Sequence, residues 1–241
     1  MDALETTTRT AAAVSQVGSH FMLDGDTYKR AATLGFEGLD FYITGRGGVL
    51  GDVDADVVSA AFTFFEPASV RTLWEQGRRV MPAARAAEEW ATSCHVWAEA
   101  HVPDDVDASR LGDLAGRVVQ TARPAGAPVF AGWRALSVPD APKARAVHHM
   151  NALRELRLGL HSGAVLAAGL SPLEALSLKT PGMAPLFGWA DLADVTDVQP
   201  RWDDAEAATN RAMAHAFAEL AGAERAELSD LAGALQQATA S

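Results

Sequence analysis

The sequence predicts a mainly α-helical fold, arranged as a compact multi-helix domain. Alanine is frequent, apolar residues recur at helical spacing, and prolines stand between segments rather than inside them. The chain has 241 residues, of which 49% are hydrophobic, enough to bury a sizeable core. We expect a single domain over residues 1–241; the alternative is a division near residue 140, into helical halves 1–140 and 141–241.

In the first half, glycines and prolines separate the expected helices. The stretch Gly45-Arg46-Gly47-Gly48 lacks the lysine and hydroxyl of a phosphate-binding loop, so we expect a turn there. Phe62 and Phe64 alternate as on a strand, which leaves residues 57–65 open between helix and strand. Ser109 is expected to cap the N-terminus of the helix that runs to about residue 122. The expected helices span residues 10–23, 28–34, 69–80, 83–101 and 109–122.

In the second half, a long helix is expected after Pro142. Ser171-Pro172-Leu173-Glu174 then has the pattern of a helix start: a capping hydroxyl, proline at the first position and glutamate three residues after the cap. A long loop with three prolines is expected over residues 179–200. Closing helices follow over residues 203–220 and 223–238.

Charge and cysteine content restrict the class of protein. The formal net charge is −11, which disfavours duplex DNA as a partner because DNA binders usually present a basic face. No apolar run reaches the roughly 20 residues of a membrane span, and the first residues do not resemble a secretory signal. Cys94 is the only cysteine, so no intrachain disulfide can form. We therefore expect a cytoplasmic protein that has no membrane partner.

The most informative feature is a stripe of charge on the long helix after Pro142. At about 100° per residue, Arg154, Arg157 and His161 fall on one face, between leucine and valine side chains. A buried charge is costly unless it is paired, so the stripe needs carboxylate partners, an anionic ligand or water. Two arginine forks one turn apart suit a doubly anionic or extended group. The alternative is neutralisation within the protein, by Glu155, Glu66 or a distant aspartate.

A second stripe on the same helix carries His148 and Glu155. This pair could transfer a proton, with mutual attraction keeping the imidazole protonated and the carboxylate ionised; the alternative is a surface ion pair. Proton-transfer candidates are thus His161, Glu155 and His148. No metal is expected, since Asp52-Val53-Asp54-Ala55-Asp56 lacks the glycine and glutamate of a calcium loop. The residues identify no cofactor.

Several segments together resemble a known family. They are Ser19-His20-Phe21, Gly45-Arg46, Leu50-Gly51, Phe62-Thr63-Phe64-Phe65-Glu66-Pro67, Trp133-Arg134-Ala135-Leu136, His148, Leu153-Arg154-Glu155, Arg157 and His161. The chain resembles an actinobacterial family labelled helix-turn-helix or MarR-like, some members of which occur in natural-product gene clusters. The resemblance implies that His20, Arg46 and Arg134 complete a ligand pocket, and Tyr42 is counted with them as a ligand-binding candidate.

The chain also departs from this family. Leu156, Leu158 and Gly159 stand where the family has a histidine and a Gly-Asp pair, and residues 181–200 are too short and proline-rich for a recognition helix and a wing. We expect at most a degenerate winged-helix-like element.

Three functions follow. The first is a small-molecule-binding protein with a polar pocket for an anion, as in a natural-product biosynthetic enzyme. The second is a ligand-sensing transcriptional regulator whose degenerate winged helix-turn-helix contacts DNA, often as a homodimer. The third is a structural module in which the charged helix is an internal ion network. Whether the chain is an enzyme stays open.

Overall fold

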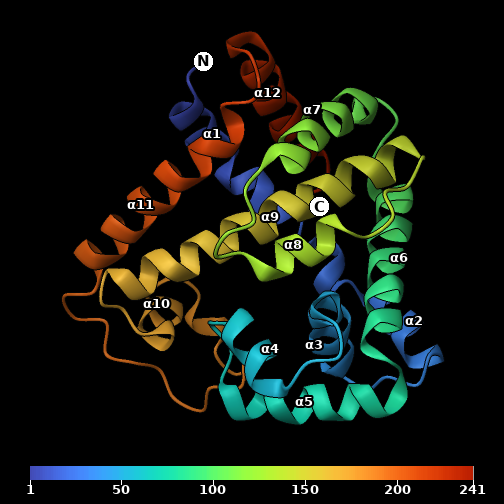
Figure 1. Ribbon diagram of the computed structural model, residues 1–241, viewed down its shortest axis with the longest axis vertical. Helices are drawn as coiled ribbons and strands as arrows, with labels where there is room; N and C mark the ends of the chain where they lie inside the picture. The colour runs from blue at the N-terminus through green and yellow to red at the C-terminus, as the bar shows by residue number, and fades with distance from the viewer. Residues whose placement is uncertain (241) are drawn as a thin grey trace.

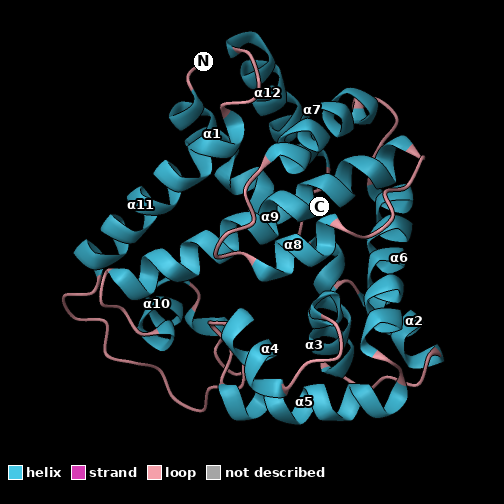
Figure 2. Cartoon of the chain, in the orientation of Figure 1, coloured by secondary structure: helices cyan, strands magenta, loops and turns pink. Residues whose placement is uncertain are grey.

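The computed structural model describes residues 1–240, and within them every regular element is a helix (Figures 1 and 2). The prediction of a mainly α-helical fold is confirmed. Residues 57–65, left open between helix and strand, form the end of a helix followed by a turn. Since residues 1–240 contain no strand, no β-hairpin wing accompanies the helices. None of the helices in this range combines the length and the apolar composition of a bilayer crossing.

Eight α-helices and two 3-10 turns precede the central helix. They are α1 (Ala3–Val17), η1 (His20–Leu23), α2 (Gly25–Thr33), α3 (Asp40–Gly47), η2 (Gly48–Leu50), α4 (Ala55–Ala61), α5 (Pro67–Val80), α6 (Ala83–His101), α7 (Ala108–Thr121) and α8 (Pro128–Arg134). The remaining elements are α9 (Pro142–Ala167), α10 (Pro172–Lys179), η3 (Pro181–Met183), α11 (Gln199–Phe217) and α12 (Gly222–Ala238).

The ends of the helices test the helix boundaries and turns that were predicted from the sequence. At α10 the expected capping box forms, with the Ser171 hydroxyl accepting from the Glu174 amide. The start of α7 was predicted wrongly: Asp107, not Ser109, caps it, because its carboxylate accepts the amide of Arg110. The expected turn at Gly45-Arg46-Gly47 is also wrong. These residues are the last turn of α3, where every side chain is buried.

The long helix α9 crosses the middle of the molecule (Figure 1). It packs against α7, α11, α6, α8 and α1, so its polar side chains face protein on several sides. One cluster of buried apolar residues contains members from Ala13 in α1 to Leu235 in α12, with the indoles of Trp74, Trp90 and Trp133 among the largest. A buried polar group on α9 therefore needs a partner on α9 itself or on a neighbouring helix.

Candidate functional site

A pocket of about 250 Å³ lies where α9, α11 and α1 meet. The three residues predicted to share one stripe of α9 all line it. We call it the polar pocket, and its lining residues are Ser15, Arg154, Arg157, Leu158, His161, Trp202 and Glu206. The stripe thus faces a cavity and not a closed core.

Arg157 is held by two groups of α11. Its Nη2 donates to Oε2 of Glu206 at 2.8 Å, and its Nη1 donates to Oδ1 of Asn210 at 2.8 Å. Burial lowers the pKa of Arg157, while the carboxylate of Glu206 opposes that shift. Glu66, considered as a partner from the sequence, instead accepts the amide of Ser69 at the start of α5. Glu206 and Asn210 were missed because nothing in the sequence links α11 to this face of α9.

His161 is fixed in one orientation by Thr209 on α11. Its Nδ1 lies 3.0 Å from the Thr209 hydroxyl, which itself donates to the carbonyl of Ala205 at 2.7 Å. The hydroxyl oxygen therefore accepts from Nδ1–H, and Nε2 of the neutral ring keeps its lone pair. Burial lowers the pKa of His161, which favours this neutral form. The ring packs against Trp202, with centroids 5.0 Å apart.

Behind the polar pocket, Glu155 joins two arginines. Arg46 of α3 donates from Nε and Nη2 to both carboxylate oxygens, at 2.8 and 2.7 Å, while Arg154 donates from Nη1 at 2.9 Å. The side chains of Arg46 and Glu155 are only 2% and 1% exposed, whereas that of Arg154 is 17% exposed. The guanidinium of Arg46 also lies over the ring of Phe62, 4.3 Å from its centroid. Only Arg154 of these three charged groups reaches an open pocket.

The buried pair stays ionised despite its surroundings. Burial alone would raise the pKa of Glu155, but the Arg46 and Arg154 guanidiniums outweigh it, and the pKa is lowered. Burial likewise disfavours the charge on Arg46, yet the carboxylate of Glu155 outweighs that effect and raises the arginine's pKa. Both charges are therefore present in the folded protein.

His148 does not pair with Glu155, which corrects the expectation from their shared stripe. Its Nδ1 lies 3.1 Å from Nε2 of His95 on α6. Burial lowers the pKa of His148 to about 3, and that of His95 and His149 to about 4. The imidazole of His148 is thus neutral rather than held protonated by a carboxylate. His148 faces His95 of α6, and His149 lies beside His148 with its ring toward Gly116 of α7; we call these three residues the neutral histidine cluster.

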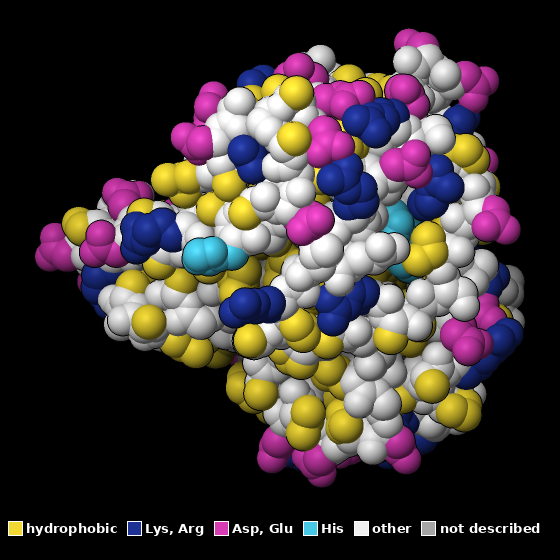
Figure 3. Space-filling view, turned by 45° about the horizontal axis from the view of Figure 1, so that its top comes forward, with side chains coloured by type: hydrophobic (Ala, Val, Ile, Leu, Met, Phe, Trp, Pro, Cys, Tyr) yellow, Lys and Arg dark blue, Asp and Glu magenta, His cyan; other side chains and the backbone are white. Residues whose placement is uncertain are grey.

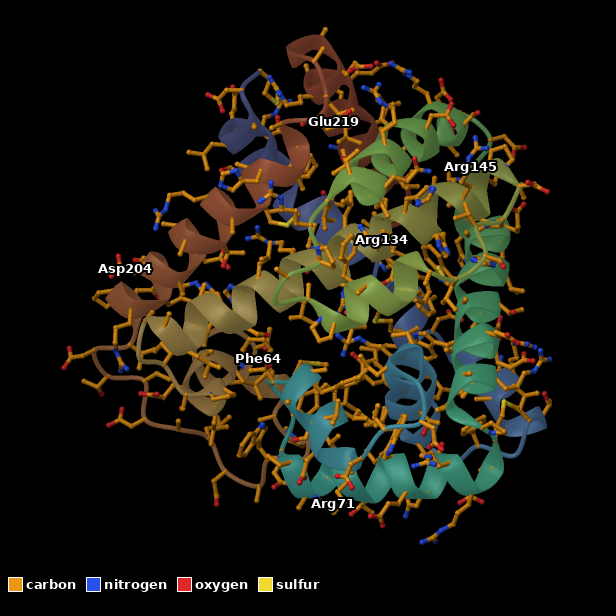
Figure 4. All side chains as sticks on the ribbon, in the orientation of Figure 1. Phe64, Arg71, Arg134, Arg145, Asp204 and Glu219 are labelled. Carbon is orange, nitrogen blue, oxygen red and sulfur yellow. The ribbon has the colours of Figure 1, made fainter. Side chains whose placement is uncertain are left out.

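The other expected ligand-binding residues lie elsewhere. His20 stacks on Trp97 of α6, with ring centroids 5.4 Å apart, and lines none of the pockets described here. Arg134 donates to the carbonyl of Ala122 at 2.7 Å, just past the end of α7. Figure 4 shows Arg134 in the middle of the molecule beside α8 and α9, apart from Phe64, which lies toward α10. The structure therefore does not bring His20 or Arg134 to the polar pocket.

The charges in and behind the polar pocket do not cancel. Arg46, Arg154 and Arg157 contribute three positive charges, and Glu155 and Glu206 contribute two negative ones. Neutral His161 adds none. The excess is one positive charge, in a protein whose overall net charge is −11.

Comparison with known proteins identifies the family of this chain. The model of the Helix-turn-helix family matches residues 7–193, which is more than half of the chain. The chain belongs to the Helix-turn-helix family. The matched region runs from residue 7, within α1, past α10, and it includes all of the site except the residues on α11. Searches of curated proteins and of solved structures return no match to this chain.

The charges on α10 and on one face of the molecule bear on whether the chain attracts DNA. Lys179 is the one basic residue of α10, and its ammonium lies over the ring of Trp202, 5.3 Å from the centroid. On the face in Figure 3, Lys and Arg side chains lie among Asp and Glu side chains and form no continuous basic patch. A mixed surface of this kind attracts phosphates weakly.

Removing the carboxylate of Glu155 should destabilise the fold far more than removing Arg154. Glu155→Gln leaves the guanidinium of Arg46 buried without a counter-charge, which should cost about 3–5 kcal/mol. Arg154→Gln leaves Glu155 with both hydrogen bonds from Arg46, so about 1 kcal/mol or less is expected. Urea unfolding of both variants measures the difference. Equal losses would contradict the view that the Arg46 pair is the structural one.

The neutral histidine cluster should make the protein less stable in acid. Because the pKa of each folded histidine lies below the ordinary value near 6.5, the unfolded chain binds more protons between about pH 6.5 and pH 4. Each such proton gives a slope of about 1.4 kcal/mol per pH unit, so stability falls as pH falls through this window. Urea unfolding from pH 7.5 to 4.5 tests this, and His95→Gln should reduce the slope by about one proton. A slope unchanged by that substitution would contradict the assignment.

Proposed function

We propose that this protein binds a small monoanionic molecule, a carboxylate, in the polar pocket. The observation that carries the proposal is the single excess positive charge among the groups in and behind the pocket. One carboxylate neutralises it, whereas a doubly charged group would leave an excess negative charge in a partly buried site. A monoanion therefore fits better than the doubly anionic ligand considered from the sequence.

Hydrogen-bond donors for such a ligand remain on the two arginines. Within residues 1–240, the Arg154 side chain makes one hydrogen bond, to Glu155, so its Nε and Nη2 are free for a ligand. The terminal nitrogens of Arg157 donate hydrogen bonds to Asn210 and Glu206, so only its Nε is free to donate to a ligand. Arg154 would thus be the main anion-binding residue, while Arg157 contributes mostly charge. In our proposal the indole of Trp202 and the ring of His161 form the walls of the site.

A reaction in this pocket would use His161. Its Nε2 carries the lone pair, so it could accept a proton from a bound ligand, as in a natural-product biosynthetic enzyme. Glu155 and His148, the other two proton-transfer candidates, are engaged with Arg46 and His95. We therefore assign Glu155 the role of holding Arg154 in place, and we give His148 no part in the chemistry. Cys94, buried and unpaired by any disulfide, suits the reducing cytoplasm where we place the protein.

A ligand carried through purification would be seen directly by mass. We expect gently purified protein to show an extra mass under native conditions that disappears on unfolding. Arg154→Gln should abolish that mass, because it removes the free donors. Arg71→Gln, which changes an exposed arginine of α5 paired with Asp56, is the matched control and should retain it. An extra mass that survives Arg154→Gln would show that the ligand is bound elsewhere.

A second candidate function is a ligand-sensing regulator that binds DNA. Membership of the Helix-turn-helix family favours it. In this version the chain would be a MarR-like actinobacterial regulator, acting as a homodimer of single-domain subunits. Its affinity for duplex DNA would fall steeply with salt, because binding releases counterions from phosphates. Fluorescence anisotropy with labelled duplex at two salt concentrations distinguishes this function from small-molecule binding alone.

A further inference from the structure

A second pocket, of about 260 Å³, lies on the other side of Arg154. We call it the apolar pocket because most of its lining side chains are hydrophobic. The lining residues come from η1, from the start of α3, from the turn between α4 and α5, from α9 and from the segment around η3: Ser19, Met22, Leu23, Leu39, Tyr42, Phe65, Arg154, Thr180, Met183, Leu186 and Phe187. Arg154 is the only charged side chain among them. Tyr42, expected from the sequence to bind ligand, lies here and not in the polar pocket.

The wall of the apolar pocket is built before any ligand binds. The ring of Phe187 stacks on that of Phe65, with centroids 4.1 Å apart and planes 16° from parallel. The carbonyl of Phe187 accepts the amide of Glu66 at 2.8 Å, which fixes the segment after η3 to the start of α5. Leu23, 53% exposed, stands at the rim. An apolar group would thus enter past one exposed leucine into a pocket walled by stacked aromatic rings.

The two pockets share Arg154 and no other lining residue. Each alone is smaller than the ~300 Å³ at which ligand pockets of proteins usually begin, but the two together lie within the usual range. A ligand that touches Arg154 from the apolar side would place apolar atoms against Phe65 and Phe187. It would place its charge at the donors that Glu155 leaves free.

We propose that the two pockets form one site and that the ligand is an amphipathic carboxylate. Its carboxylate binds Arg154, and its hydrocarbon or aromatic body fills the apolar pocket. This inference rests on the proposed function and adds the chemical class of the ligand. The charge excess sets the single negative charge, and the shared arginine sets where the polar end meets the apolar one.

The test is a series of straight-chain carboxylates that differ only in length. Acetate, butanoate, hexanoate and octanoate are titrated into the full chain by calorimetry, at constant ionic strength. Affinity should rise about fourfold for each methylene buried, until the apolar pocket is full. Arg154→Gln should abolish binding of every acid in the series, which separates binding at the site from adsorption of long chains to the surface.

One variant should act on the apolar end alone. Met183 is half-buried in the pocket lining, and the larger side chain of Met183→Trp is expected to occupy space that the body of the ligand would fill. It should remove the gain from chain length, so that octanoate binds about as tightly as acetate. Leu192→Trp, at an exposed position farther along the same segment, is the matched control and should behave like the natural chain. If Met183→Trp fails to fold, Met183→Gln provides the same comparison with a similar shape, and it should flatten the dependence on chain length.

The outcomes separate the two proposals. Affinity that rises with chain length and is lost in Arg154→Gln supports the amphipathic ligand. Affinity that depends on Arg154 but not on chain length overturns this inference and leaves the proposed function standing. An absence of binding by every acid overturns both.

Discussion

The ion pair between Arg46 and Glu155 is the constraint on which the rest of this structure depends. Two buried charges stabilise a fold only if they are paired with well-aligned hydrogen bonds. Here two parallel hydrogen bonds of 2.8 and 2.7 Å join the guanidinium of Arg46 to the carboxylate of Glu155. The pair joins α3 to α9 across the core. All residues of α3 are buried, and this ion pair adds a polar contact to the apolar packing of the helix. Arg154 then takes its orientation from the same carboxylate.

The central helix carries polar groups on several faces, which is unusual for a buried element. Several of these groups bond to neighbouring helices: His148 to α6, Glu155 to α3, and Arg157 and His161 to α11, whereas the buried side chain of Asn151 has no hydrogen-bond partner within residues 1–240. This arrangement fixes the packing of three helices around α9. Arg154 also keeps donors that no protein group uses, and Arg157 keeps its Nε. The candidate site is therefore a place where side chains that line a pocket keep free hydrogen-bond donors.

Local signals in the sequence predicted the fold well, and long-range pairing limited what could be predicted of the site. Helical spacing placed Arg154, Arg157 and His161 on one face, and the capping pattern at Ser171 located the start of α10. Sequence spacing could not supply Glu206 or Thr209, because they come from a helix about 48 residues farther along the chain. Helical spacing also gave a wrong prediction for His148 and Glu155. Both side chains point to the same side of α9, but because they are seven residues apart they contact two different helices. The short helix α8 was missed because Pro128 begins it within a segment rich in loop-forming residues.

The hydrogen bonds at Glu155 have a thermodynamic consequence. Arg154 lines both pockets, it is bonded to Glu155, and Glu155 is bonded to Arg46, whose guanidinium rests on Phe62 just past the end of α4. A ligand that displaces Arg154 therefore acts on α3 and on the turn between α4 and α5. Linkage is reciprocal: any partner that shifts those helices changes the affinity for the ligand by the same factor that the ligand changes the affinity for the partner. If the proposed ligand binds at Arg154, its binding and the placement of α3 to α5 would therefore change together.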